Sequence, residues 1–102
     1  MERTALDRLR KIEKVWGSPN IGLVLTAAHY EGECLSADDI AAQTGLTRAT
    51  TYNHLKRLEN VGRVTRQKTG RNSVYCAVLK WASWTRDTLL GNERMRGQPP
   101  AT

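Results

Sequence analysis

Apolar residues recur along the chain with a spacing that changes from helical to extended and back to helical. Residues 3–16 carry apolar side chains at steps of three and four, which predicts an amphipathic helix that ends at Gly17. Ser18 and Pro19 then supply an N-cap and a first-turn proline for a second helix over residues 21–31. Because this second helix is apolar on most sides, we expect it to be the most buried element.

A short extended piece at Cys34 and Leu35 leads into two closely spaced helices. Ser36 begins a capping-box-like start for a helix over residues 37–44. Gly45 can adopt the left-handed conformation that ends this helix, and the next helix begins about two residues later. This spacing is that of a helix-turn-helix.

The next helix, over residues 47–61, can be capped by Thr47 and has one apolar face. Thr51, Leu55 and Leu58 lie at i, i+4 and i+7 and are expected to be buried. At 100 degrees per residue, the opposite face and its flanks carry polar, cationic and small side chains instead of a second apolar stripe. They are Ala49, Thr50, Tyr52, Asn53, Lys56, Arg57 and Asn60.

Two extended segments, residues 63–68 and 73–78, are joined by residues 69–72, whose glycine and asparagine suit a tight hairpin. In the second segment the alternation predicts one set of side chains facing inward and the other set facing away. The inward set is Val74, Cys76 and Val78, and the other set is Tyr75 and Ala77.

A final helix is expected over residues 79–94, with Trp81 and Trp84 on one side. The sequence therefore predicts a mainly α fold with a small β-hairpin wing, an α+β winged helix-turn-helix, as a single domain over residues 1–96. Residues 97–102 contain glycine and two prolines and are expected to form a disordered tail.

Positive charge is concentrated in one part of the chain. Residues 47–72 hold seven cations and one anion, Glu59, whereas the remaining residues hold nine of each sign. The formal net charge of +6 therefore arises entirely within the helix-turn-helix and hairpin segment, as a phosphate-binding surface requires. The seven cations are Arg48, Lys56, Arg57, Arg63, Arg66, Lys68 and Arg71.

Double-stranded DNA is the partner that this pattern favours, because its major groove admits one α-helix. Asn53 can contact adenine, and Lys56 or Arg57 can contact guanine or phosphate. The full set expected in the major groove is Arg48, Ala49, Thr50, Tyr52, Asn53, Lys56 and Arg57. The set expected at the DNA backbone or in the wing is Thr47, Arg66, Lys68, Thr69, Gly70, Arg71 and Asn72.

Other chemistries find little support in the residues. His29 and His54 form neither a metal pair nor a nucleophile–base set, so no enzyme activity, metal or cofactor is expected. Cys34 and Cys76 lack metal-ligand spacing and a disulfide framework, and are expected to be small buried hydrophobic residues. With no long apolar run or secretion signal, the chain is expected to be cytoplasmic and nucleoid-associated, without a membrane partner.

Residues 24–78 resemble the winged helix-turn-helix of prokaryotic transcription regulators of the MarR and ArsR type. The resemblance is carried by Leu35-Ser36-x-x-x-Ile40-Ala41, Thr44-Gly45-Leu46-Thr47, His54-Leu55-x-x-Leu58-x-x-x-Gly62-x-Val64 and a basic wing ending in Val74-Tyr75. The cysteines that metal-sensing members carry in the first helix of the motif are replaced by Ala41 and Ala42, so metal sensing is not expected. The chain is also short for the MarR type, which argues against a large ligand pocket.

In regulators of this type the terminal helices usually form a two-fold dimer, which implies a homodimeric repressor on an inverted repeat. The side chains expected at the dimer interface are Leu6, Leu9, Ile12, Trp16, Trp81 and Trp84. Two alternatives remain open: an accessory protein for plasmid or phage partition, transfer or replication, and a winged helix that binds another protein. The operator, any small-molecule effector, the choice between repression and activation, and the redox activity of the cysteines stay undetermined.

Overall fold

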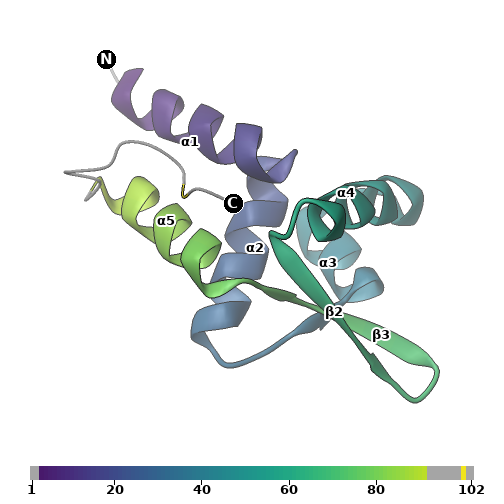
Figure 1. The fold of residues 1–102 in the computed structure, drawn as a ribbon. Helices are drawn as coiled ribbons and strands as arrows, with labels where there is room; N and C mark the ends of the chain where they lie inside the picture. The colour runs from purple at the N-terminus through teal and green to yellow at the C-terminus, as the bar shows by residue number, and fades with distance from the viewer. Residues whose placement is uncertain (1–2, 92–99, 101–102) are drawn as a thin grey trace.

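The computed structural model describes residues 3–91 and residue 100 (Figure 1). Two predictions fall partly outside these described residues. They are the last residues of the final helix, 92–94, and the tail, of which only residue 100 is described. In chain order the elements are α1 (Arg3–Trp16), α2 (Pro19–Tyr30), β1 (Leu35–Ser36), α3 (Ala37–Thr44), α4 (Arg48–Asn60), β2 (Val64–Thr69), β3 (Asn72–Ala77) and α5 (Leu79–Leu90).

The predicted caps determine where three of the helices begin. The hydroxyl groups of Ser18, Ser36 and Thr47 each accept a hydrogen bond from the backbone N–H three residues later. Gly45, with a φ of 78°, ends α3 in the left-handed conformation. The helix-turn-helix predicted from this turn chemistry is therefore confirmed.

Helix α2 lies at the centre of the molecule, between α1 and α5 on one side and α3 on the other (Figure 1). Gly22 allows α1 and α2 to approach closely, because a Cβ at this position would lie 2.4 Å from Cδ1 of Trp16. The indole N–H of Trp16 donates to the hydroxyl oxygen of Thr85 at 2.8 Å, which ties α1 to α5 inside the core. Tertiary packing therefore joins the two terminal helices to one shared core.

Burial in this core contradicts part of the predicted dimer interface. Ile12, Trp16, Trp81 and Trp84 are buried within the single chain, and the rings of Trp81 and Trp84 meet edge to face. Assigning these four residues to a dimer interface was wrong, since their apolar surface is already covered by the same chain. The helical spacing identified an apolar face correctly, but that face covers the chain's own core.

The three strands form an antiparallel sheet in the order β1-β3-β2. The hairpin of β2 and β3 was predicted, but the pairing of β1 with β3 was not. The inward and outward sets of β3 are reversed from the prediction, because Tyr75 and Ala77 are buried whereas Val74 and Cys76 are only half-buried. All the β3 residues concerned can pack against a core, so the sequence could not determine which alternate set faces the helices.

Cys34 and Cys76 form a disulfide bond, which corrects their expected role as unpaired core residues. The pairing of Leu35 with Tyr75 places the two cysteines opposite each other, one residue further along the ladder. Their Cα atoms are 4.6 Å apart, a distance typical of a non-hydrogen-bonded antiparallel pair. The bond thus links the segment before the helix-turn-helix to the central strand across 42 residues of sequence.

No helix among the described residues is long and apolar enough to cross a lipid bilayer.

Candidate nucleic-acid interface

The buried face of α4 fixes the orientation of its opposite face. Thr51, Leu55 and Leu58 are buried as predicted, and the hydroxyl of Thr51 also donates to the carbonyl oxygen of Thr47 at 2.9 Å. Helix α4 rests on α3 and β2, so these contacts hold it firmly against the body of the protein. The residues predicted for the opposite face, Ala49, Asn53, Lys56 and Asn60, are all exposed.

An exposed cation lies at the N-terminal end of α4. The Nε atom of Arg48 is 3.0 Å from a carboxylate oxygen of Asp38 on α3, and its guanidinium carbon is 5.9 Å from the ring centre of Tyr52. Both partners of this ion pair are largely exposed, so the pair contributes little to stability and can be exchanged for another anion at small cost. The free backbone N–H groups and dipole of the helix end also favour a phosphate here.

The wing is the hairpin of β2 and β3, which has a two-residue loop and projects away from α1 and α5 (Figure 1). Thr69 pairs with Asn72, which leaves Gly70 and Arg71 at the tip. Gly70 has a φ of 61°, the positive value that a type II′ turn requires at its first central position. Lys68 and Arg71 are therefore held on an exposed, twisted ribbon next to the turn.

Between α4 and the wing lies a trough that continues around Tyr52. One hollow of about 330 Å³ is bordered by α3, the start of α4 and the wing, with Arg48, Arg66 and Arg71 among its lining residues. A second hollow of about 370 Å³ continues along α4 past Asn53 and Lys56. The structure thus brings seven of the predicted contact residues together along the two hollows: Arg48, Tyr52, Asn53, Lys56, Arg66, Arg71 and Asn72.

Most of the predicted contact residues are exposed, although only some of them line the trough. Thr50 is half-buried, and Arg57 lies at the side of α4 that faces the end of α1. The other predicted contact residues are all exposed: Thr47, Arg48, Ala49, Tyr52, Asn53, Lys56, Arg66, Lys68, Thr69, Gly70, Arg71 and Asn72.

One of the seven clustered cations serves a different purpose. Arg63 donates from Nη1 to the carbonyl oxygen of Val15 at 2.5 Å, and its guanidinium carbon is 4.6 Å from the ring centre of Trp81. It is half-buried between α1 and α5 and does not line the trough. The cations counted along the sequence therefore include one, Arg63, that lies away from the trough.

Two acidic residues and one aromatic residue belong to this surface without having been assigned to it. Asp38 pairs with Arg48, and Glu59 accepts a hydrogen bond from Nε of Arg66 at 3.4 Å. Tyr75 lies beneath the trough, where burial is the main cause that raises the pKa of its phenol, with Tyr52 and Glu59 adding to the shift and Arg66 opposing it. Had Tyr75 and Ala77 been predicted as the inward-facing residues of the second strand, Tyr75 would have been expected to be buried at this position.

His54 lies against the turn after α1, where a Cβ at Gly17 would come within 2.7 Å of its Nδ1 atom. Burial, and secondarily the charge of Arg57, lowers the pKa of His54 below its ordinary value of 6.5. The unfolded chain therefore takes up this proton first, and the stability of the folded state falls as the pH drops below 6.5 toward the lowered pKa.

We expect an NMR titration of the His54 ring to give a pKa below 6.5. Replacing Arg57 with glutamine should raise that pKa without restoring the ordinary value, because burial is the larger cause. The matched substitution Arg10→Gln, on the exposed surface of α1, should leave it unchanged. An ordinary pKa for His54 in the wild-type protein would contradict this packing.

The family model described as sugar-specific transcriptional regulator TrmB matches residues 31–81, which contain the helix-turn-helix, the wing and the start of α5. The chain belongs to this family. It is therefore a DNA-binding transcriptional regulator, and the residues of the matched segment include the entire trough. No curated protein matches the sequence.

Solved structures similar to this TrmB-family chain are winged-helix regulators, which confirms the predicted fold. MepR, a regulator of the Staphylococcus aureus multidrug efflux pump MepA, is 18% identical with a TM-score of 0.68, over 90% of this chain and 70% of that one. Tm0710 from Thermotoga maritima is 20% identical with a TM-score of 0.64, over 89% of this chain and 65% of that one.

A third similar structure is the winged helix-turn-helix domain of Mb0332 from Mycobacterium bovis, described as homodimeric and as a possible ArsR-family regulator. It is 18% identical with a TM-score of 0.62, over 100% of this chain and 96% of that domain. The expected resemblance to MarR- and ArsR-type regulators is thus confirmed for the fold. Neither the partition and transfer alternative nor the protein-binding alternative gains support from these similarities.

Proposed function

We propose that this TrmB-family regulator is a homodimeric repressor that binds an inverted repeat in duplex DNA at the nucleoid. The observation that carries the proposal is the outward face of α4, which is exposed, polar and cationic along its length and stands beside a basic wing. The α4 helix would enter the major groove, and the wing would follow the backbone or reach the adjacent minor groove.

Within the groove, Asn53 and Lys56 are the side chains best placed to contact base edges. They lie near the middle of the exposed face of α4, and an asparagine can pair with adenine through two hydrogen bonds. Ala49 offers its methyl group to a thymine methyl, and Arg57 contacts a base edge or a phosphate from the side of the helix. These residues would determine which sequence is bound.

Phosphate contacts would come from the start of α4 and from the wing. Arg48 and Arg66 are each held by an exposed carboxylate, with N···O distances of 3.0 and 3.4 Å. Such pairs orient the guanidinium groups in the free protein and are weak enough to be exchanged for DNA phosphates. Thr47, Lys68 and Arg71 would add contacts that fix the position of the protein on the duplex but do not depend on its sequence.

For the dimer, we propose the exposed leucines of the two terminal helices. Leu6 and Leu9 on α1 are 48% and 37% exposed, and Leu89 and Leu90 on α5 are 43% and 61% exposed. Helices α1 and α5 contact each other on the side of the molecule away from the wing (Figure 1). The homodimeric Mb0332 domain, which has the same fold, supports an assembly of this kind.

Replacing Leu9 with aspartate is expected to convert the dimer to a monomer, because a carboxylate would have to be buried in the apolar interface. Light scattering at several protein concentrations measures the mass. Leu79→Asp is the matched control, since Leu79 is 62% exposed at the opposite end of α5, and this variant should remain dimeric. A dimeric mass for Leu9→Asp would place the interface elsewhere.

The function is tested by selecting bound fragments from a random duplex library with the purified protein near physiological salt. A two-fold dimer should enrich an inverted repeat whose half-sites are centred about one helical turn, roughly 34 Å, apart. Enriched direct repeats would instead indicate that copies bind side by side, as in partition or transfer. An absence of enrichment would contradict sequence-specific binding.

A further inference from the structure

Arg63 lies where the chain passes from α4 into β2, and its backbone is bonded to two other parts of the fold. Its N–H donates to the carbonyl oxygen of Leu58 in α4 at 2.9 Å, and its carbonyl oxygen accepts from the N–H of Val78 at 3.1 Å. Val78 directly precedes α5. The backbone of this one residue is therefore bound both to α4 and to the start of the last helix.

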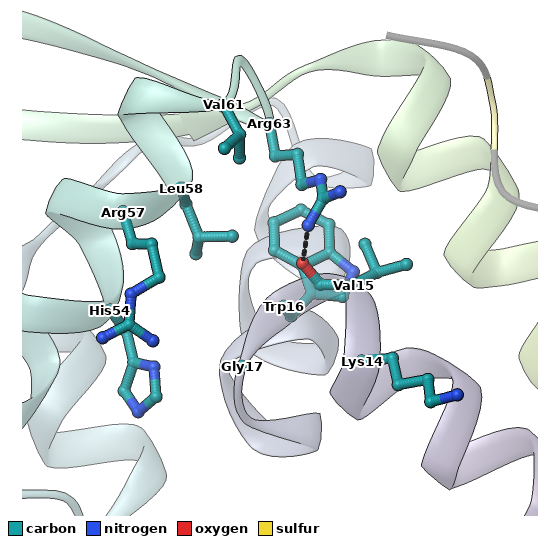
Figure 2. Close-up of a pocket in the computed structure, with 9 residues that line it drawn as sticks. All are labelled: Lys14, Val15, Trp16, Gly17, His54, Arg57, Leu58, Val61 and Arg63. Atoms are coloured by element: carbon teal, nitrogen blue, oxygen red, sulfur yellow. Dashed lines mark hydrogen bonds between the residues drawn. The ribbon is translucent and has the colours of Figure 1, made fainter.

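The side chain of Arg63 extends this connection to α1. Figure 2 shows it reaching the last turn of α1, where Nη1 donates to the carbonyl oxygen of Val15 at 2.5 Å. Carbonyl groups in the last turn of a helix have no partner within that helix, so Val15 offers a free acceptor. The guanidinium carbon of Arg63 also lies 4.6 Å from the ring centre of Trp81 in α5. A planar guanidinium can stack and donate at the same time, which makes lysine a poor substitute here.

The contact between the end of α1 and the C-terminal half of α4 is otherwise incomplete. A hollow of about 160 Å³ lies between them, next to Arg63 (Figure 2). His54 of α4 rests against Gly17 beside this hollow, whereas the main packing of α4 is on α3 and β2. An unfilled space supplies no packing that resists movement of one wall relative to the other. The hydrogen bond of Arg63 to Val15 is therefore well placed to restrict such movement.

We infer that Arg63 is a positioning residue that fixes the orientation of α4 relative to α1 and α5. In the proposed dimer, α1 and α5 form the interface, so their angle to α4 sets the separation of the two α4 helices. That separation determines which spacing between half-sites the dimer binds. This consequence rests on the proposed function, whereas the orientation of α4 within one chain does not.

The length of the spacer between the half-sites is a sensitive measure of this orientation. One additional base pair moves a half-site by about 3.4 Å along the duplex and turns it by about 35° around the axis. A rigid dimer cannot follow both changes without losing base contacts from one α4 helix. The wild-type protein should therefore bind the selected spacing at least about tenfold more tightly than spacings one base pair longer or shorter.

The variant Arg63→Met keeps an apolar side chain against Trp81 but loses the donor to Val15. We expect the preference for the selected spacing to fall from about tenfold to about threefold or less. The dimer mass and the affinity for a duplex with a single half-site should not change. Arg86→Met is the matched control, because Arg86 also stacks at 4.6 Å on an aromatic ring, that of Tyr30, but links α5 to α2. This control should keep the spacing preference of the wild type.

A second measurement needs no DNA. Residual dipolar couplings of the backbone amides, from isotope-labelled protein in a weakly aligning medium, report the orientation of each helix. One alignment frame should fit α1, α4 and α5 together in the wild type. In Arg63→Met, α4 should depart from the frame that fits α1 and α5, and a common frame for all three helices would overturn the positioning role.

The binding experiment has its own contrary results. An undiminished spacing preference in Arg63→Met would overturn the inference, and so would loss of binding to the single half-site, because Arg63 would then act on DNA contacts directly. If Arg63→Met does not fold, Arg63→Lys takes its place in both measurements with the same expected directions, since it keeps the charge but lacks the planar guanidinium. A wild-type protein without any spacing preference would instead contradict the proposed dimer on an inverted repeat, and the dipolar couplings would then decide the role of Arg63.

Discussion

Replacing Asn53 with alanine is expected to cost about 1–3 kcal/mol of binding free energy for the selected duplex, or roughly a 5- to 150-fold increase in dissociation constant. The reason is that the amide would lose a paired set of hydrogen bonds to one base while the fold stays intact. Asn53 is exposed on α4 and is not part of the hydrophobic core. The affinity is measured by titrating labelled duplexes with protein. One duplex has the selected sequence, and each of the others replaces one base pair of it with one of the three alternatives.

Two further variants make the Asn53 result specific. Asn20→Ala, an exposed asparagine near the start of α2, should bind the selected duplex as the wild type does. Arg71→Ala at the tip of the wing should weaken selected and random duplexes by similar factors and reduce the dependence of binding on salt. Equal losses on selected and random DNA for both Asn53→Ala and Arg71→Ala would show that α4 does not determine the sequence bound.

Loss of the Cys34–Cys76 disulfide is expected to lower the free energy of unfolding by about 2–4 kcal/mol. The bond closes a loop across 42 residues that contains the helix-turn-helix and most of the wing, so it removes many conformations from the unfolded chain. The expected decrease in Tm is about 10 °C or more for a domain of this size. Thermal unfolding of the oxidised protein, with and without a thiol reductant, measures it.

The Cys34→Ser variant provides the control for this experiment. It should unfold at the temperature of the reduced wild-type protein and show no further response to reductant, since one thiol alone cannot re-form the bond. Residues of the enclosed segment such as Ile40, Leu55 and Val64 are buried in the hydrophobic core, so the reduced protein should remain folded at low temperature. Identical unfolding of oxidised and reduced wild-type protein would show that the bond does not constrain the chain.

The helix-turn-helix could be predicted because the information that specifies it is local. Ser36, Gly45 and Thr47 act on backbone groups within a few residues of themselves, and they determine where α3 and α4 begin or end. The burial of Leu55 and Leu58 follows from helical spacing alone. The same local signals placed the exposed face of α4, and with it most of the candidate DNA-binding residues.

The features that the sequence did not reveal depend on contacts between distant segments. Pairing of β1 with β3 brings Cys34 next to Cys76, and a two-residue strand carries too little pattern to predict that pairing. Trp81 could have packed against a second copy or against its own chain, and only the arrangement of α1, α2 and α5 decides this. Arg63 likewise has the sequence context of a DNA-binding cation but stacks on that same tryptophan.

The central claim is that α4 and the wing form the DNA-binding surface. The most direct test is to titrate the isotope-labelled protein with the selected duplex and follow each backbone amide signal. The account predicts that the perturbed signals concentrate in residues 47–60 and 66–72, with smaller changes in α2. Perturbations concentrated in α1 and α5, with the signals of α4 and the wing unchanged, would contradict it.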